Sequence, residues 1–233
     1  MRQSNQEEIK SWFNDMYRKK GFDYLRPQVA YQIFLHHLDA KPDQKLLDVA
    51  CGLGLMLKTA DEFGVNACGV DLADEAVKIA KTFVPNAYVQ VANAESLPFE
   101  PGQFDLITCL GSLERMLDLP KVLSQLNRVG NSHARYCFMV RNSNTFIWRF
   151  FKRFLGMQNS AGHQDAKNQE QWHDVFENAG FSIESVTRDH WPIMRWKRWL
   201  SLGILPVDYS HQPFSPIPIK YATEFIFVLK KMS

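Results

Sequence analysis

The sequence predicts an α/β fold in which a doubly wound, mostly parallel sheet carries helices on both faces. Short apolar runs alternate with helical patterns through the middle of the chain, and such alternation is typical of parallel strands joined by crossover helices. The first apolar run ends in a glycine-rich turn that a helical stretch follows, the order found at a nucleotide-binding corner. A chain of 233 residues, 45% of them hydrophobic, is long enough for one such domain.

Two helices are expected before the sheet, in a segment that spans residues 1–40. In the first, residues 5–20, one helical stripe carries apolar side chains, and Gly21 ends the pattern. Those side chains are Ile9, Trp12, Phe13, Met16 and Tyr17. The second expected helix covers residues 28–38 and follows Pro27.

The strands divide the rest of the chain into a core, two insertions and a last strand. Five expected strands lie in a core of residues 41–141, and two more lie near the C-terminus. Residues 142–222 hold two substrate-side insertions (142–170 and 190–222) and the sixth strand, and residues 223–233 hold the last strand. The expected strands are 45–50, 66–71, 87–92, 104–110, 134–141, Phe181–Arg188 and Thr223–Lys230.

The turn after the first strand indicates the class of ligand. Gly52 and Gly54 let the backbone turn sharply and approach a ligand, since glycine has no Cβ. Asp71 ends the next strand about 20 residues later, the offset at which a carboxylate meets ribose hydroxyls in dinucleotide-binding folds. The third glycine of a dinucleotide fingerprint would fall on Leu57, however, which disfavours a pyrophosphate ligand. A carboxylate at Asp48 would also repel phosphate and attract an ammonium group.

Four segments, in order and at family spacing, resemble the motifs of class I S-adenosylmethionine (SAM)-dependent methyltransferases of the small-molecule, type 11-like kind. The segments are Leu46–Gly54, Gly69–Leu72, Ala92–Phe99 and Phe104–Glu114. The resemblance implies a seven-stranded Rossmann-like sheet whose last strand is antiparallel. It also implies SAM as the cofactor and S-adenosylhomocysteine as the product.

The resemblance assigns residues to each end of the cofactor. Asp48 and the backbone of Ala50, Cys51, Gly52 and Gly54 would hold the amino acid end. Asp71 would bind the ribose, and Leu72 would pack beside the adenine, which Asn93, Ala94 and Glu95 would border. Leu110 would line the floor near the methyl group. For the acidic residues and Asn93, the alternative is a turn or a helix cap.

Two weaker assignments concern the N-terminal segment. Arg26 could pair with the cofactor carboxylate, and Tyr17 or Tyr24 could close over the cofactor. The alternative for this segment is a solvated helix end.

The chain departs from the family pattern at three positions. Ala50 stands where glycine is usual, and we expect its methyl group to be tolerated. Asn93 stands where aspartate is common, and its carbonyl can still accept a hydrogen bond from adenine. Arg115 stands where many relatives carry histidine, so no histidine near the methyl group is assigned.

Composition and motifs argue against several other classes. A net charge of +2 is too small to indicate a nucleic-acid partner, and neither an Asn/Asp-Pro-Pro-Tyr/Phe motif nor a Pro-Cys pair occurs. No apolar run is long enough to span a membrane, and no leader pattern opens the chain. The four cysteines form no C-x-x-C pair, so we expect reduced thiols, no metal and a cytoplasmic protein.

The C-terminal third indicates the acceptor. Residues 147–155 and 191–200 mix aromatic and basic side chains, a pattern typical of helices that lie on a membrane surface. The alternative is that these helices only cap the substrate pocket. Either case favours a small, hydrophobic or lipid-linked acceptor, with O- or C-methylation. His163 and His190 are candidate bases, but no catalytic residue is assigned.

Two other functions remain as alternatives to the enzyme. One is a catalytically silent binding or assembly module that has kept the fold. The other is a nicotinamide oxidoreductase, which Leu57 in the glycine position disfavours.

Overall fold

The computed structural model describes residues 5–145, 165–191 and 218–232. The basic aromatic segment predicted at 147–155 lies outside these residues, and so does the one at 191–200 except for Trp191. His163 and His211 also lie outside them.

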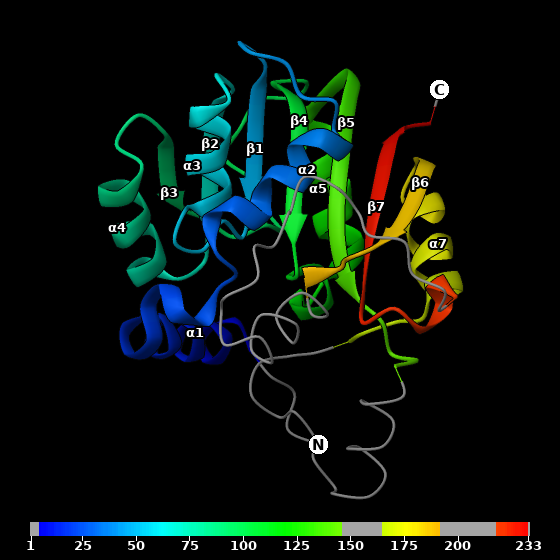
Figure 1. The fold of residues 1–233 in the computed structure, drawn as a ribbon, viewed down its shortest axis with the longest axis horizontal. Helices are drawn as coiled ribbons and strands as arrows, with labels where there is room; N and C mark the ends of the chain where they lie inside the picture. The colour runs from blue at the N-terminus through cyan, green and yellow to red at the C-terminus, as the bar shows by residue number, and fades with distance from the viewer. Residues whose placement is uncertain (1–4, 146–164, 192–217, 233) are drawn as a thin grey trace, which may run out of the picture.

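One seven-stranded sheet forms the centre of the described structure, in the order β3-β2-β1-β4-β5-β7-β6 (Figure 1). The strands are β1 (Lys45–Val49), β2 (Asn66–Asp71), β3 (Tyr88–Val91), β4 (Phe104–Leu110), β5 (Gly130–Arg141), β6 (Phe181–Arg188) and β7 (Glu224–Lys231). All seven expected strands are present, and β5 begins four residues earlier than the apolar pattern indicates because Gly130 already pairs with Phe104.

The direction of the strands confirms the predicted fold class. Strands β1 to β5 pair in parallel, whereas β7 is antiparallel to both β5 and β6. The strand order reverses at β1, which lies between β2 and β4. In open α/β sheets, ligands bind at the carboxyl ends of the strands beside such a reversal.

Helices cover both faces of the sheet (Figure 1). The α-helices are α1 (Gln6–Lys20), α2 (Gln32–His37), α3 (Leu55–Glu62), α4 (Asp74–Phe83), α5 (Leu119–Val129) and α7 (Gln169–Asn178). The 3₁₀ turns are η1 (Gly21–Tyr24), η2 (Gln28–Tyr31), η3 (Leu113–Arg115) and η4 (Ile219–Tyr221). The helix predicted over 28–38 is therefore two pieces, with a 3₁₀ turn at its start as is common at helix N-termini.

Side-chain caps define where several helices begin. The Asn5 side chain accepts from the Glu8 N–H at the start of α1. Asn168 and Gln171 form a reciprocal capping box at the start of α7. These caps satisfy backbone donors that the helix itself leaves free.

An aromatic cluster fixes α7 against β5 and β7. The Phe176 ring lies 5.5 Å from that of Phe138 and 5.0 Å from that of Phe227, measured between centroids. Trp172 is fully buried, and its indole N–H donates to the Arg141 carbonyl at 3.0 Å. The core therefore positions the last residue of β5, which matters for the site below.

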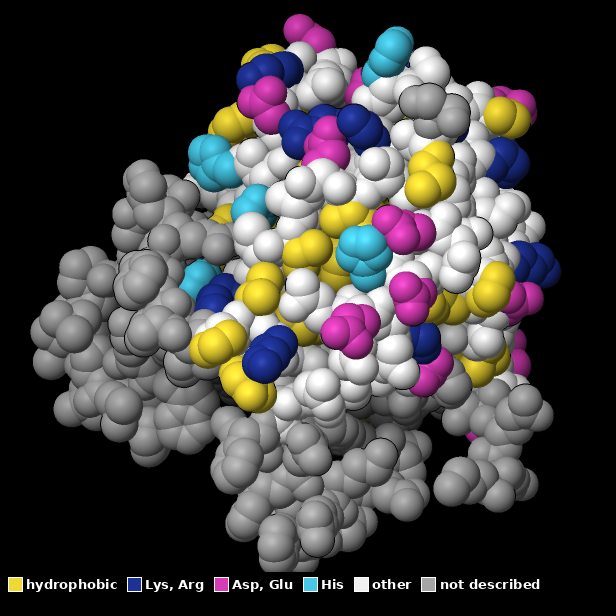
Figure 2. Space-filling view, turned by 90° about the vertical axis from the view of Figure 1, so that its right-hand side faces the viewer, with side chains coloured by type: hydrophobic (Ala, Val, Ile, Leu, Met, Phe, Trp, Pro, Cys, Tyr) yellow, Lys and Arg dark blue, Asp and Glu magenta, His cyan; other side chains and the backbone are white. Residues whose placement is uncertain are grey.

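The surface at the β6 end of the sheet carries no large field of one sign on the residues that the structure describes. Acidic and basic side chains are interspersed there with single apolar ones (Figure 2). A nucleic acid is usually bound by a stripe of positive charge, and this part of the surface has none among its described side chains.

Candidate functional site

The turn between β1 and α3 is built from residues with positive φ. Gly52 has φ of 52° and Gly54 has φ of 86°, values that favour glycine. A Cβ on Gly52 would lie 2.9 Å from the Tyr17 hydroxyl oxygen, and one on Gly54 would lie 3.2 Å from the Ala80 Cβ. Both glycines are therefore required by conformation and by packing.

Ala50 adopts the same left-handed conformation without being glycine. Its φ is 61°, where a Cβ crowds the following carbonyl oxygen at a cost of about 1–2 kcal/mol. The chain therefore has a methyl group where we expect it to be tolerated, at a residue whose backbone is strained.

Asp71, at the end of β2, braces this turn. Its two carboxylate oxygens accept from the backbone N–H groups of Gly52 at 2.8 Å and Ala73 at 2.9 Å. Burial raises the pKa of Asp71, although these hydrogen bonds oppose the change. The sequence predicts that Asp71 binds a ribose, and the structure adds that its carboxylate holds the glycine turn.

Asp48 lies deeper in the sheet than Asp71. It is 3% exposed, and the Thr108 hydroxyl donates to its carboxylate at 2.6 Å. Burial raises the pKa of Asp48 to about 7, and the neighbouring Asp71 contributes in the same direction. Sequence reasoning missed Thr108, although a hydroxyl within the apolar strand β4 was a visible signal.

A cavity opens at the carboxyl ends of β1 and β2. It encloses about 650 Å³ of space, including the part that is open to solvent. The lining residues are Gln6, Ile9, Phe13, Tyr17, Val49, Ala50, Val70, Asp71, Leu72, Ala92, Asn93, Ala94, Glu95, Ser112, Arg115, Met116 and Leu117.

Seven of the thirteen residues predicted for the cofactor line this cavity, namely Tyr17, Ala50, Asp71, Leu72, Asn93, Ala94 and Glu95. Gly52 lies next to it beneath Tyr17. Asp48, Cys51, Gly54, Leu110 and Arg26 are not among the lining residues. Cys51 instead packs beside Gly69, where its Sγ would lie 2.9 Å from an added Cβ, and Leu110 packs against a core cluster on the other face.

Helix α1 forms one wall of the cavity. Gln6, Ile9, Phe13 and Tyr17 all line it, and their spacing places them on one face of the helix. The Gln6 side-chain oxygen accepts from the Asn93 amide at 2.8 Å. Only Tyr17 was predicted for the site from this helix, whereas its apolar stripe was the signal for the rest.

The side chain of Asn93 closes a turn, which is the alternative that the sequence leaves open for this residue. Its side-chain oxygen accepts from the Glu95 N–H at 3.0 Å, and its amide is engaged by Gln6. Asn93 therefore shapes the cavity edge between β3 and the next segment.

Arg115 joins the loop after β4 to helix α1. Its guanidinium carbon lies 5.7 Å from the centre of the Trp12 ring and 5.4 Å from that of Phe13. Such cation–π contacts stabilise by about 0.5–2 kcal/mol. Where many relatives carry histidine, this chain thus has a buried arginine that lines the cavity.

The structure places Arg26 outside the lining of the cavity. Its guanidinium donates to Asp189 at 2.7 Å and lies 3.7 Å from Glu224, away from the cavity. A buried guanidinium needs a carboxylate partner, and segments far along the chain supply one. These contacts all use Nη2 of Arg26, whereas its Nη1 is buried with no hydrogen-bond acceptor among the described residues.

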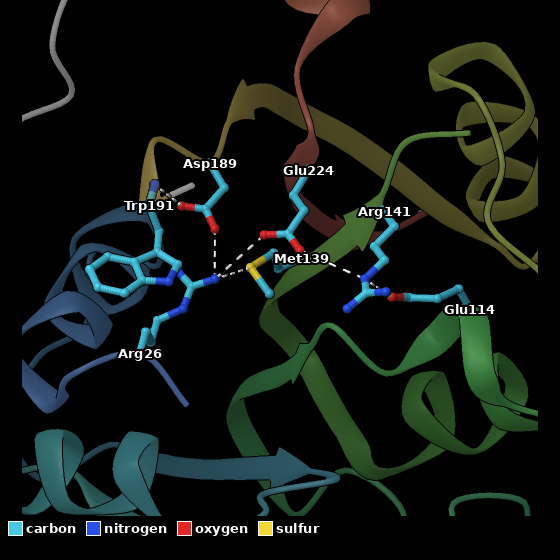
Figure 3. A network of polar contacts seen from close by, with 7 residues as sticks. All are labelled: Arg26, Glu114, Met139, Arg141, Asp189, Trp191 and Glu224. Carbon is cyan, nitrogen blue, oxygen red and sulfur yellow. Dashed lines mark hydrogen bonds and ion pairs between the residues drawn. The ribbon is translucent and has the colours of Figure 1, made fainter. Parts of the chain in front are cut away.

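Arg26 belongs to a chain of alternating charges (Figure 3). After the pair of Arg26 with Asp189, the next members of this charge chain are Glu224 and Arg141. The Nε of Arg141 lies 3.8 Å from Glu224 and 3.5 Å from Glu114. Both oxygens of Glu114 are buried and accept no hydrogen bond from the described residues. Glu114 ends one of the family-like segments, but no motif indicated Arg141, Asp189 or Glu224.

The remaining candidates show no metal chemistry. Within residues 5–145, 165–191 and 218–232, no group of three or more His, Cys, Asp or Glu side chains could hold a metal ion. His190 is buried beside Asp189, whereas His173 lies on α7 at 3.3 Å from Glu177. Among the described residues, no helix is long and apolar enough to cross a membrane.

Comparisons with known proteins agree with this architecture. A family model described as a methyltransferase domain matches residues 17–186. An uncharacterized methyltransferase of Bacillus subtilis is 23% identical over 180 residues, covering 75% of this chain and 71% of that protein. A ubiquinone biosynthesis O-methyltransferase of Acinetobacter baumannii is 24% identical over 175 residues, covering 69% of this chain and 73% of that protein.

Solved structures show the same fold. The YcgJ protein of Bacillus subtilis superposes with a TM-score of 0.63 at 20% identity, covering 88% of this chain and 99% of that one. A Haemonchus contortus N-methyltransferase, in complex with phosphomonomethylethanolamine and S-adenosylhomocysteine, gives a TM-score of 0.69 at 17% identity. That match covers 97% of this chain and 60% of the other. The family match over most of the core, together with the sheet order and the glycine turn, shows that this chain belongs to the SAM-dependent methyltransferases of the Rossmann-like class I fold.

Proposed function

We propose that this protein transfers the methyl group of SAM to a hydroxyl oxygen of a small, hydrophobic acceptor. The observation that carries the cofactor part is the cavity that joins the Asp71-braced turn to the wall of α1. Methyl transfer is an in-line displacement in which the enzyme aligns the two reactants and excludes water.

The cavity supports a definite placement of the cofactor. Asp71 would bind the ribose hydroxyls, because it lines the cavity and its carboxylate retains lone pairs beyond its two backbone hydrogen bonds. Asn93, Ala94 and Glu95 would border the adenine, beside Leu72. Asp48, buried beneath the glycine turn, would attract the ammonium group of the methionyl end.

Two features support an oxygen acceptor of hydrophobic character. The Acinetobacter relative acts in ubiquinone biosynthesis as an O-methyltransferase. In addition, the segments at 147–155 and 191–200 are rich in tryptophan, phenylalanine and basic residues, which suit a lipid-like acceptor met at a membrane surface. A quinone precursor, an isoprenoid or a lipid-linked saccharide would each fit as the acceptor. The proposal places the protein itself in the cytoplasm.

Calorimetry with SAM, S-adenosylhomocysteine and NAD tests the cofactor. The proposal expects the two sulfur nucleosides to bind and NAD not to bind. Tight NAD binding, or no binding of either sulfur nucleoside, would contradict it. Turnover of labelled SAM with polyprenylated phenols then separates an enzyme from a silent module, which would bind SAM and transfer nothing.

Sedimentation with lipid vesicles tests the surface contact. Binding to anionic vesicles at low salt, weakened at high salt and absent with neutral vesicles, is expected. If the protein ignores anionic vesicles at low salt, the acceptor is met in solution.

A further inference from the structure

The charge chain lies at a different part of the sheet edge from the cofactor cavity. Its members, in order, are Asp189, Arg26, Glu224, Arg141 and Glu114. The cavity lies over the ends of β1 and β2. Arg141 ends β5 and is paired in register with Glu224, the first residue of the antiparallel β7. Glu114 follows β4, and Asp189 follows β6. These five residues therefore lie along the same edge of the sheet as the cavity, on the β4-β5-β7-β6 side.

Two members of this chain are more open to solvent than the other three. The Arg141 side chain is 37% exposed and the Glu224 side chain 15%, whereas those of Glu114, Arg26 and Asp189 are 7% exposed or less. A ligand that arrives at this edge would therefore touch Arg141 and Glu224 first. Arg26 and Asp189 lie to one side of Glu224, and Glu114 lies beside Arg141 (Figure 3).

The contacts of Asp189 and Glu224 with their neighbours determine which of these two carboxylates stays ionised. Asp189 accepts from Arg26 at 2.7 Å and from the Trp191 N–H at 3.0 Å. Burial opposes its ionisation, but Arg26 outweighs burial and keeps the pKa of Asp189 below its usual value. Glu224 has only the longer contacts of 3.7 Å to Arg26 and 3.8 Å to Arg141 as ion pairs among the described residues. Burial, and then the neighbouring Asp189 charge, raise the pKa of Glu224.

We propose that Glu224 accepts the proton of the acceptor's hydroxyl group and that Arg141 holds the oxygen from which it leaves. This inference rests on the proposed methyl transfer and names its acceptor class as a phenol or alcohol that is uncharged in solution. An anionic acceptor is disfavoured because the charge chain contains three carboxylates and two guanidinium groups, so negative charge is in excess.

The proposed step is balanced in atoms and charge. The O–H bond breaks and its proton goes to the Glu224 carboxylate, while the oxygen lone pair forms a bond to the methyl carbon of SAM. The carbon–sulfur bond breaks, and its electron pair stays on the sulfur to give S-adenosylhomocysteine. Glu224 then releases the proton to solvent. A base is most effective when its pKa lies near the working pH, and a guanidinium stabilises developing negative charge on oxygen.

The other residues are positioning residues. Glu114 places its carboxylate 3.5 Å from the Arg141 Nε, and Trp172 holds the Arg141 backbone through its carbonyl. Arg26 and Asp189 hold Glu224 from the opposite side. Each of these groups is buried, so none is expected to touch the acceptor.

The test uses 4-nitrocatechol, a phenol whose neutral and ionised forms absorb at different wavelengths, added to the full-length protein saturated with S-adenosylhomocysteine. At a pH below the ionisation of the free probe in water, the wild type should bind it as the phenolate. Glu224→Gln and Arg141→Gln should each bind at least tenfold more weakly and should not shift the spectrum toward the phenolate. Glu184→Gln is the matched control and should behave as the wild type, because Glu184 lies on β6 in an exposed ion pair with Arg135 of β5.

The possible outcomes separate this inference from the proposed function. If calorimetry shows that the wild type does not bind S-adenosylhomocysteine, the methyl-transfer proposal itself is overturned. If that nucleoside binds and the wild type binds no nitrocatechol or binds it un-ionised, the inference about Glu224 and Arg141 is overturned. The same holds if Glu224→Gln gives the wild-type spectrum. If a variant fails to fold, the wild-type spectrum still tests the inference, because binding of the un-ionised probe or no binding would overturn it.

Discussion

The Gly52 N–H donates to the Asp71 carboxylate at 2.8 Å, so the end of β2 holds the glycine turn that follows β1. The same carboxylate lines the cavity. One side chain thus shapes the backbone of the site and presents charge to the ligand.

Replacing Asp71 should weaken the cofactor site by two routes. Asp71→Ala removes hydrogen bonds to the ribose that are each worth about 1.5–3 kcal/mol, so S-adenosylhomocysteine should bind at least tenfold more weakly by calorimetry. From the sequence alone, the position of Asp71 at a strand end predicts that the substitution leaves folding nearly intact. The structure predicts a loss of stability as well, because two buried N–H groups lose their acceptor. Asp71→Asn keeps one acceptor and should lie between. Unchanged affinity in Asp71→Ala would remove this residue from the site.

Ala50→Gly should stabilise the fold. A φ of 61° costs alanine about 1 kcal/mol relative to glycine, part of which the greater freedom of glycine in the unfolded chain offsets. Urea unfolding should show a higher midpoint with an unchanged slope. Ala73→Gly is the control, since Ala73 has φ of −83° and should lose stability. A lower midpoint for Ala50→Gly would show that the Ala50 methyl makes a packing contact that outweighs the strain.

Cofactor affinity should rise with pH through the titration of Asp48. Burial raises its pKa to about 7, far above the unperturbed value of about 3.9. Below pH 7 the protonated form of Asp48 is therefore favoured in the ligand-free protein, and its contribution to stability is fully present below about pH 4 and is lost as the pH rises from about 4 to about 7. The cofactor ammonium favours the carboxylate, so binding at pH 6 should release a proton that calorimetry detects in buffers of different ionisation enthalpy.

Asp48→Asn is the control for that proton release. It cannot titrate, so the dependence of the binding enthalpy on the buffer should disappear. If the wild type shows no such dependence between pH 6 and 8, Asp48 does not take up the charge of the ligand.

Arg26→Met should reduce stability strongly but leave cofactor binding alone. Removing one partner of a buried ion pair costs about 3–5 kcal/mol, and Arg26 is buried against Asp189 and Glu224. The folded variant should bind S-adenosylhomocysteine within twofold of the wild type. Arg18→Met removes an exposed pair with Asp15 and Glu75 and should cost less than about 1 kcal/mol. A tenfold loss of affinity in Arg26→Met would restore the cofactor role predicted from sequence.

Local signals in the sequence determined the strands, the glycine turn and the order of the motifs. Each strand is a short apolar run, and the positive φ of Gly52 and Gly54 is a property of the residues themselves. The residues of this corner are near neighbours in the chain or lie one strand apart. The family resemblance predicts Tyr17, Ala50, Asp71 and Asn93 for one site, and the structure places all four in the lining of one cavity.

Tertiary structure alone decided the partners of Arg26. Its contact with Asp189 joins residues 163 positions apart, and Glu224 reaches both arginines only because β7 runs antiparallel between β5 and β6. A charged residue carries no sequence period that indicates its partner, whereas burial in a low-dielectric interior makes pairing obligatory. Motifs thus predicted residues that line the cavity proposed for the cofactor, whereas the packing of distant strands assembled the charge chain proposed for the acceptor.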